Sequence, residues 1–214
     1  MKDYSNGKIT MKKNTKGKIT KALIVNKSLQ LFSVKGFHNT SMSDIMEETN
    51  LTKGGIYAHF KSKDLIWYAC YDRAVAMWRN IIFDNMRMIT NPYERLVRLI
   101  EKHLFDYVGS NIFKQGGFFL SMLIEFSGQC EDKTAHVLKG FTGYSQLIES
   151  WINEGVEKGL IKDTVNSNEV GNFIVSTFYG ATVIYTASKN EKILRQAANQ
   201  LHNFLKSLKV SPEQ

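Results

Sequence analysis

The chain has 214 residues, of which 43% are hydrophobic, 12% aromatic and 22% charged. This is the composition of an ordered globular protein, long enough for one large or two small domains. No run approaches the roughly 18 apolar residues of a membrane span, and the basic N-terminus lacks the apolar core of a secretory signal, so we expect a cytoplasmic protein. The two cysteines, Cys70 and Cys130, are too few for a disulfide scaffold.

The net charge of +8 is unevenly distributed. Residues 1–65 hold 12 Lys against 5 Asp and Glu, a net charge of +7, whereas residues 66–214 carry only +1. A positive field concentrated on a small module indicates an anionic partner. Nucleic acid is the first candidate and an anionic membrane surface is the second.

The N-terminal 17 residues are polar, lysine-rich and aperiodic, and we expect them to form a flexible basic arm. From Lys18 the apolar residues recur at helical spacing as far as Gly36, which predicts a helix. Lysines of the arm and of the helix start can contact DNA in the minor groove, or can serve as a solvated tail that only raises affinity. These lysines are Lys2, Lys8, Lys12, Lys13, Lys16 and Lys18.

Two short helices are expected next. Thr40 or Ser41 can cap the first of them, and Thr52 can cap the second. Two short helices separated by about four residues, after a longer supporting helix, are typical of a helix-turn-helix unit. The glycines Gly54 and Gly55 stand in the first turn of the second short helix, although each costs a helix about 1 kcal/mol relative to alanine.

The rest of the chain also has a helical pattern. We expect helices at residues 62–87, 91–109, after the glycine pair 116–117, and at 131–159, 166–188 and 190–209. No strand-like alternation is found, so the sequence predicts an all-α protein of about nine helices. The expected domains are the arm at 1–17, a three-helix helix-turn-helix domain at 18–65 and a larger helical domain at 66–210.

The segment GFHNTSMSDIMEETNLTKGGIYAHFKSKDLI, residues 36–66, resembles the DNA-binding region of the tetracycline-repressor (TetR) family of bacterial regulators. The resemblance covers roughly residues 18–70 and implies that the helix after Thr52 lies in the major groove of DNA. It implies DNA contacts by Thr40, Ser41, Thr52, Lys53, Gly54, Tyr57, Ala58, His59 and Lys63. Ala58 departs from the aromatic residue often found at its position, and an alanine does not reach a phosphate.

For the second domain, the resemblance implies a homodimer formed by the last two helices. The interface residues expected on their apolar stripes are Phe173, Ile174, Ala181, Ile184, Leu194, Leu201 and Phe204. Large aromatic and methionine side chains also concentrate in this domain. Each one alone is a typical core residue, but together they can enclose an apolar effector pocket. The candidates are His103, Phe119, Met122, Phe126, Tyr144, Trp151 and Phe178, with Glu125 as a further polar group.

The sequence and this resemblance therefore predict a ligand-responsive transcriptional regulator that binds a pseudo-palindromic operator as a homodimer. Repression is expected because it is the commoner activity in the family that the chain resembles. A small, largely apolar effector is expected to release DNA by tilting the helix at 62–87. The alternatives are a basic protein of the membrane surface or, less favoured, an enzyme. The five histidines show no metal or nucleophile spacing, and no nucleotide-binding motif occurs. We therefore expect no catalysis, metal or cofactor.

Overall fold

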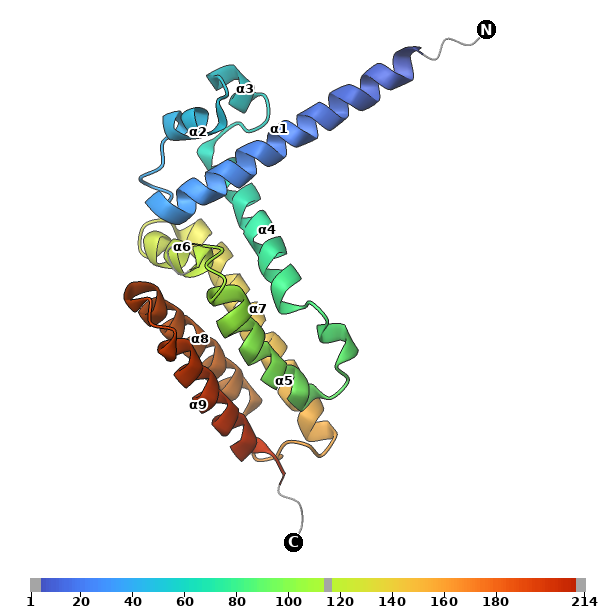
Figure 1. Ribbon diagram of the computed structural model, residues 1–214, viewed down its shortest axis with the longest axis vertical. Helices are drawn as coiled ribbons and strands as arrows, with labels where there is room; N and C mark the ends of the chain where they lie inside the picture. The colour runs from blue at the N-terminus through green and yellow to red at the C-terminus, as the bar shows by residue number, and fades with distance from the viewer. Residues whose placement is uncertain (1–4, 114–116, 211–214) are drawn as a thin grey trace. The chain divides into compact units, whose positions relative to one another are not determined.

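The computed structural model describes residues 5–113 and 117–210, with side chains from residue 15 onward. Within these ranges the chain forms nine α-helices, one short 3₁₀ helix and one π-helix, which confirms the all-α prediction. The chain divides into two compact units, Met1–Ala76 and Met77–Gln214. Figure 1 labels the helices in chain order.

The first unit consists of α1 (Ser5–Lys35), α2 (Met42–Thr49), α3 (Lys53–Tyr57) and the first part of α4 (Lys63–Ile82). Apolar side chains from each of these helices are almost fully buried, and they are Ile24, Leu29, Phe32, Ile45, Ile56, Ile66 and Trp67. The short helices α2 and α3 are therefore stabilised by packing rather than by their own length, because an isolated helix of one or two turns is not stable in water.

The helix α1 begins at Ser5, earlier than the expected start at Lys18. Residues 5–17, expected as a flexible arm, are therefore helical in the structure. Once a helix is anchored by packing, extending it requires no new nucleation, and lysine, methionine and isoleucine tolerate a helix well. Lys2 lies outside the described residues, and the side chains of Lys8, Lys12 and Lys13 are not described.

The boundary between the units falls inside α4, after Ala76, and not after residue 65 as expected. The first half of α4 belongs to the first unit because it supplies part of that core. The Trp67 ring lies 6.4 Å from the Phe37 ring, and the Cys70 thiol donates a hydrogen bond to the Val25 carbonyl at 3.3 Å. A helix that contributes to two cores cannot be divided from its periodicity alone.

The helix α4 ends at Ile82, before the predicted Arg87, and a 3₁₀ helix, η1 (Met86–Met88), follows. Asn85 has a φ of 60°, a left-handed conformation that asparagine tolerates better than most residues. This residue interrupts the helical path that the apolar pattern predicts as continuous.

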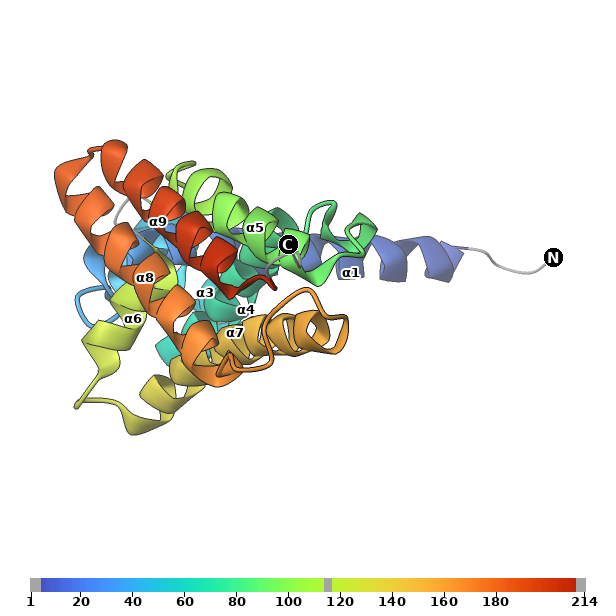
Figure 2. The same cartoon turned by 90° about the horizontal axis from the view of Figure 1, so that it is seen from below.

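The second unit contains the remaining helices, which are α5 (Pro92–Glu101), the π-helix η2 (Lys102–Val108), α6 (Phe118–Phe126), α7 (Glu131–Glu157), α8 (Ser167–Ser188) and α9 (Lys192–Leu208). Helix α7 packs against α5, α6 and α8, and α9 packs against α8 and α5, as Figures 1 and 2 show. Asn91 and Asn166 cap α5 and α8 with their side-chain oxygens. Gly116, part of the expected glycine pair, lies outside the described residues.

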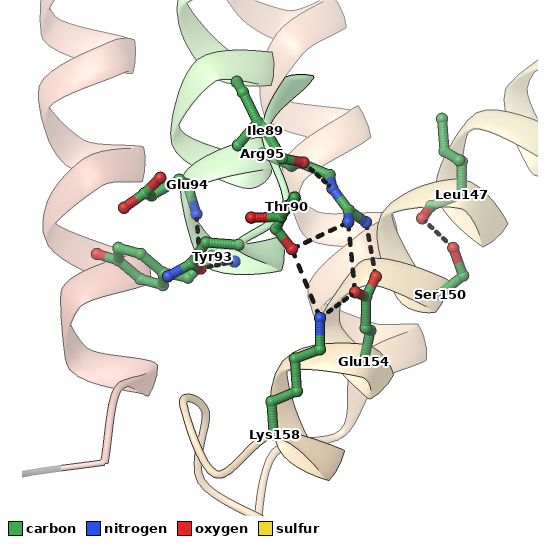
Figure 3. Close-up of polar contacts among 10 residues, drawn as sticks. Ile89, Thr90, Tyr93, Glu94, Arg95, Leu147, Ser150, Glu154 and Lys158 are labelled. Carbon is green, nitrogen blue, oxygen red and sulfur yellow. Dashed lines mark hydrogen bonds and ion pairs between the residues drawn. The ribbon is translucent and has the colours of Figure 1, made fainter. Parts of the chain in front are cut away.

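A polar network ties the segment before α5 to α7 (Figure 3). The Arg95 guanidinium forms an ion pair with Glu154 at 2.6 Å and also donates to the carbonyls of Ile89 and Thr90. Lys158 donates to the same Glu154 carboxylate at 2.7 Å. Hydrogen bonds from Lys158 and then Arg95 lower the pKa of the Glu154 carboxyl. The network fixes the chain segment that follows α4 and η1.

In the parts of the chain that the structure describes, no helix combines the length and apolar content needed to cross a membrane.

Candidate nucleic-acid interface and buried polar cluster

The turn between α2 and α3 is held by local hydrogen bonds. Ser41 caps α2 by accepting from the Asp44 amide at 3.0 Å, while the Asp44 carboxylate accepts from the Ser41 amide at 2.7 Å. This is a reciprocal capping box. Hydrogen bonds from Lys35 and then Ser41 hold the pKa of the Asp44 carboxyl well below its usual range. Asn50 ends α2 in the left-handed conformation, with φ of 53°, and Thr52 caps α3 by accepting from the Gly55 amide at 3.2 Å.

The start of α3 is exposed, and Gly54 stands there without a reason in the fold. A Cβ added at Gly54 would meet no atom of the described residues within 4 Å, and its φ is not in the left-handed region. At Gly55, by contrast, a Cβ would approach Thr52 Oγ1 at 3.4 Å. Neither packing nor backbone conformation requires glycine at position 54, although it costs the helix about 1 kcal/mol. Close approach of an outside partner would explain it.

Polar and basic side chains surround Gly54. Lys53 is exposed, with its Nζ 5.9 Å from the centre of the Tyr57 ring. Tyr57 and His59 are half-buried, and Ala58 is exposed. With Thr52, Lys53 and Gly54 they give α3 an accessible surface that contains a positive charge, a phenol and a short stretch of open backbone. These groups suit contact with a phosphate backbone and with base edges.

Two of the predicted contact residues have structural roles instead. Thr40 is fully buried, and its hydroxyl donates to the Gly36 carbonyl at 2.6 Å. The Lys63 ammonium donates to the carbonyls of Phe37 and Thr40, both at 2.9 Å, and lies 4.3 Å from the centre of the Phe37 ring. Thr40 therefore offers no hydroxyl to a phosphate, and Lys63 stabilises the loop between α1 and α2. A sequence pattern does not reveal that a lysine side chain folds back onto carbonyls.

In the second unit, three predicted effector residues come together. The fully buried His103 stacks on Phe178, with ring centres 4.1 Å apart and planes within 7°. His103 Nδ1 lies 3.2 Å from the Tyr144 hydroxyl. Burial lowers the pKa of His103 to about 3 and raises the pKa of Tyr144 well above its ordinary value, so both side chains are neutral near pH 7.

Tyr107, one helical turn after His103, is not singled out by the sequence pattern but joins these side chains in the structure. Its ring lies 5.6 Å from the His103 ring, and its hydroxyl and His103 Nε2 are both buried without a hydrogen-bond partner in the described part of the chain. Burial raises the pKa of Tyr107. The spacing of His103 and Tyr107 on one helix was the available signal. We refer to His103, Tyr107, Tyr144 and Phe178 as the buried polar cluster.

The other predicted effector residues lie elsewhere in the second unit. Phe119, Met122 and Phe126 are buried side chains of α6. Contacts between rings connect α6 to the cluster, since Phe113 lies 5.9 Å from Phe118 and 6.4 Å from Tyr107. Trp151 instead lies 5.9 Å from the Arg95 guanidinium, beside the network of Figure 3. Glu125 is half-buried.

An open pocket of about 360 Å³ lies at the end of the second unit where η2, α8 and α9 meet. It is lined by Phe105, Gly109, Tyr185, Glu191, Leu194 and Arg195. An exposed ion pair joins Arg195 to Glu191 at 2.7 Å. None of the predicted effector residues lines this pocket, so it is separate from the buried polar cluster.

The predicted interface residues of α8 and α9 divide into two groups. Phe173 and Ile184 are 50% and 54% exposed, and Phe204, 4.9 Å from Phe173, is partly exposed. Ile174, Ala181, Leu194 and Leu201, expected at the interface, are instead buried in the protomer itself and offer almost no surface to a partner. The outward face also includes Val183, which is 48% exposed, and Gly180, where an added Cβ would meet nothing within 4 Å.

Comparison with known families identifies both units. Residues 24–67 match the family described as bacterial regulatory proteins, tetR family. Residues 92–201 match the family described as tetracyclin repressor-like, C-terminal domain. Together these matches cover most of the chain.

Individual relatives are more distant. The biofilm operon icaADBC HTH-type negative transcriptional regulator IcaR of Staphylococcus aureus is 23% identical over 141 residues, covering 66% of this chain and 72% of that protein. A TetR transcriptional regulator from Chloroflexus aurantiacus has a similar fold, with a TM-score of 0.86 at 23% identity over 92% of this chain and 100% of its own. A transcriptional regulator from Saccharomonospora viridis, solved in complex with choline, has a TM-score of 0.75 at 21% identity over 90% of this chain and 98% of its own.

Proposed function

Because the chain belongs to the TetR family of bacterial regulatory proteins, we propose that it is a ligand-responsive repressor. It is a DNA-binding transcriptional regulator and not an enzyme. It binds a pseudo-palindromic operator as a homodimer in the cytoplasm and leaves the operator when a small effector enters the second unit. The relative IcaR is a negative regulator by its own description, which supports repression over activation.

The observation that carries the proposed DNA contact is the glycine at position 54. Because the described surroundings of Gly54 are open, the fold itself does not require glycine there. A DNA duplex lying close to the start of α3 would require it. Thr52, Lys53, Tyr57 and Ala58 complete the proposed contact surface. Lys53 contributes a phosphate contact, and Ala58 is small enough to touch a thymine methyl group.

Homodimerisation is supported by the outward face of α8 and α9. Phe173, Val183 and Ile184 are large apolar side chains about half exposed on one helix. Gly180 lies between them in sequence, and its open side permits close approach of a second backbone. Several large apolar side chains exposed on one helix are typical of an interface. A two-fold axis through it would present two copies of α3 to DNA about one helical turn apart.

Effector control requires that binding in the second unit changes DNA affinity. Helix α4 contributes residues to both units, so it can transmit a change from one to the other, and the network at Arg95 holds the chain that follows it. Coupling of about 1–3 kcal/mol, or roughly a 5- to 150-fold loss of affinity, is sufficient for such a switch.

The proposal is tested with purified protein, a library of duplex DNA and anionic lipid vesicles. We expect selected duplexes to bind at least about a thousandfold more tightly than random duplex DNA near physiological salt. Binding should weaken steeply as salt rises, because phosphate contacts release counterions. Vesicle binding that equals or exceeds the binding of every duplex would instead favour the membrane-surface alternative.

A further inference from the structure

Among the described residues of the second unit, two of the buried polar atoms without a hydrogen-bond partner lie on neighbouring rings. They are His103 Nε2 and the Tyr107 hydroxyl, on side chains that are 0% and 6% exposed. Native proteins satisfy the large majority of their buried polar groups, so each exception requires an explanation such as a ligand or a water molecule. Two exceptions on neighbouring rings, 5.6 Å apart, indicate one shared partner.

The hydrogen bond between His103 and Tyr144 sets the character of the unpartnered nitrogen. Among the described residues, His103 Nδ1 is the partner found for the Tyr144 hydroxyl. If the Tyr144 hydroxyl donates to Nδ1, its proton is satisfied, and neutral His103 then carries its own proton on Nε2. The other tautomer would leave the buried Tyr144 proton without an acceptor. His103 Nε2 is then a donor, and the Tyr107 hydroxyl can donate as well, so a partner shared by both is an acceptor.

The charges around these donors exclude an ionic partner. Lys102, next to His103 in sequence, is itself buried and is paired with Asp106 at 3.1 Å and Asp84 at 3.4 Å. Within the described residues, no lysine or arginine nitrogen is buried without a partner. A carboxylate bound at His103 and Tyr107 would therefore be buried without a free countercharge, which is costly. A cation would face the positive ends of one N–H and one O–H donor, which is also unfavourable.

The surroundings of the two donors are aromatic. His103 is stacked on Phe178, and Tyr107 contacts the Phe113 ring at 6.4 Å. Both donors belong to the π-helix η2, and π-helical segments occur frequently at functional sites. Aromatic walls favour a planar apolar frame, through edge and face contacts.

We infer that the effector is a neutral, planar aromatic compound with a carbonyl-type oxygen, and that His103 Nε2 and the Tyr107 hydroxyl both donate to this oxygen. The inference rests on the proposed effector-responsive function and assigns the chemistry of the effector.

Access to the donors requires a local opening. A small pocket beside Tyr107 is lined by Val108, Asn111, Ile112, Phe113, Gly117 and Thr186 as well. It holds about 10 Å³, which is room for about one water molecule. An aromatic effector therefore enters only when the side chains around η2 move apart, as in a pocket that the ligand itself opens. Such an opening changes the packing of η2 against its neighbours and provides a route to control.

The inference is tested with four small probes of similar size on the full-length protein. Acetophenone carries the neutral carbonyl, ethylbenzene lacks the oxygen, benzoate is anionic and phenyltrimethylammonium is cationic. Binding is followed by ligand-observed NMR up to about 10 mM, since fragments of this size bind weakly. We expect acetophenone to bind at least about fivefold to tenfold more tightly than each of the other three, the gain expected from one or two hydrogen bonds.

Two variants identify the donors. Tyr107→Phe removes one oxygen, and His103→Phe keeps a ring against Phe178 but removes both nitrogens. Each should reduce the preference for acetophenone over ethylbenzene by about fivefold. The matched control is Tyr185→Phe, because the Tyr185 hydroxyl already accepts from Asn111 at 3.3 Å, and it should keep the wild-type preference.

A preference for benzoate or for phenyltrimethylammonium would overturn the inference. So would equal binding of acetophenone and ethylbenzene, a preference that survives both variants, or no binding of any probe, which would leave water as the partner of the two donors. Duplex DNA binding is measured on the same preparations. If the wild-type protein binds operator DNA but shows no preference for the carbonyl probe, only the inferred chemistry of the effector is wrong. If the wild-type protein does not bind DNA specifically, the proposed function is contradicted.

Discussion

At the level of single residues, the most informative feature is a side chain that is missing. Glycine at position 54 costs helix stability and fills no tight space in the protein, so its value must lie in what it lets the surface contact. His103 shows the converse case. It is fully buried, and its Nε2 has no hydrogen-bond partner among the residues that the structure describes. Each residue taken alone is unfavourable for folding. Gly54 lies on the proposed DNA-contact surface, and His103 lies in the proposed effector site.

Substitution of Gly54 should separate folding from DNA binding. Gly54→Ala should raise the free energy of unfolding of the first unit by up to about 1 kcal/mol, because alanine favours the helix and its Cβ meets no atom within 4 Å. The same change should weaken operator binding, and Gly54→Leu should abolish it. Urea unfolding and fluorescence anisotropy with operator DNA measure the two effects. Gly143→Leu, at an exposed and equally open glycine of α7, is the control and should leave operator binding unchanged.

Burial of neutral His103 should make stability depend on pH. Its pKa falls from 6.5 to about 3 on folding because of desolvation. Between these values the unfolded chain binds a proton that the folded chain does not, so stability is complete above pH 6.5 and decreases as the pH falls. The free energy of unfolding should drop by up to about 1.4 kcal/mol per pH unit over this window. His103→Phe should have a flatter profile between about pH 6.5 and pH 5 in chemical denaturation, and an unchanged slope would contradict the assignment.

At the level of elements, the sequence predicted the helices better than it predicted the direction of their side chains. Caps at Ser41 and Thr52 could be identified because each uses a local hydrogen bond within three residues. The inward turn of Lys63 could not, because its acceptors are carbonyls more than twenty residues away in sequence. The apolar pattern of α8 likewise did not separate the buried Ile174 from the exposed Phe173, because the packing of α8 against α7 and α9 decides which side of the helix is covered.

The two lysines at Lys53 and Lys63 should therefore behave differently when neutralised. Lys53→Met should reduce the slope of log affinity against log salt by about 0.9, since one phosphate contact is lost, while urea unfolding stays unchanged. Lys63→Met should lower the free energy of unfolding by about 1.5–3 kcal/mol, because it removes charge-assisted hydrogen bonds from the loop carbonyls. If Lys63→Met is as stable as the wild type, the proposed role of Lys63 in the loop is wrong.

At the level of the whole molecule, the two units differ in net charge and in the kind of partner proposed for each. The positive charge of the chain is concentrated in residues 1–65, and the second unit carries the apolar outward face of α8 and the buried polar cluster. The all-α fold could be predicted from periodicity and the scarcity of proline. The boundary inside α4 could not, since its residues serve both cores.

The dimer is tested on the outward face of α8. Ile184→Glu places a charge on a side chain that is 54% exposed, and two copies of that charge would face each other across a two-fold axis. We expect the dimer dissociation constant to rise at least about thirtyfold, the loss of an interface hot spot, and operator affinity to fall with it. Sedimentation velocity measures the change. Ile124→Glu, on a 66% exposed isoleucine of α6, should leave the protein dimeric. A wild-type protein that is monomeric at all concentrations would contradict the homodimer.

The central claim is that the chain recognises a specific two-fold symmetric DNA sequence through α3. The most direct measurement is selection of bound fragments from genomic DNA by the purified protein, in parallel with Gly54→Leu. We expect the wild-type protein to enrich a few fragments that share an inverted repeat, with half-site centres about 34–36 Å or a multiple of it apart, and Gly54→Leu to enrich none. Enrichment of no shared sequence by the wild-type protein, or the same enrichment by Gly54→Leu, would contradict the claim.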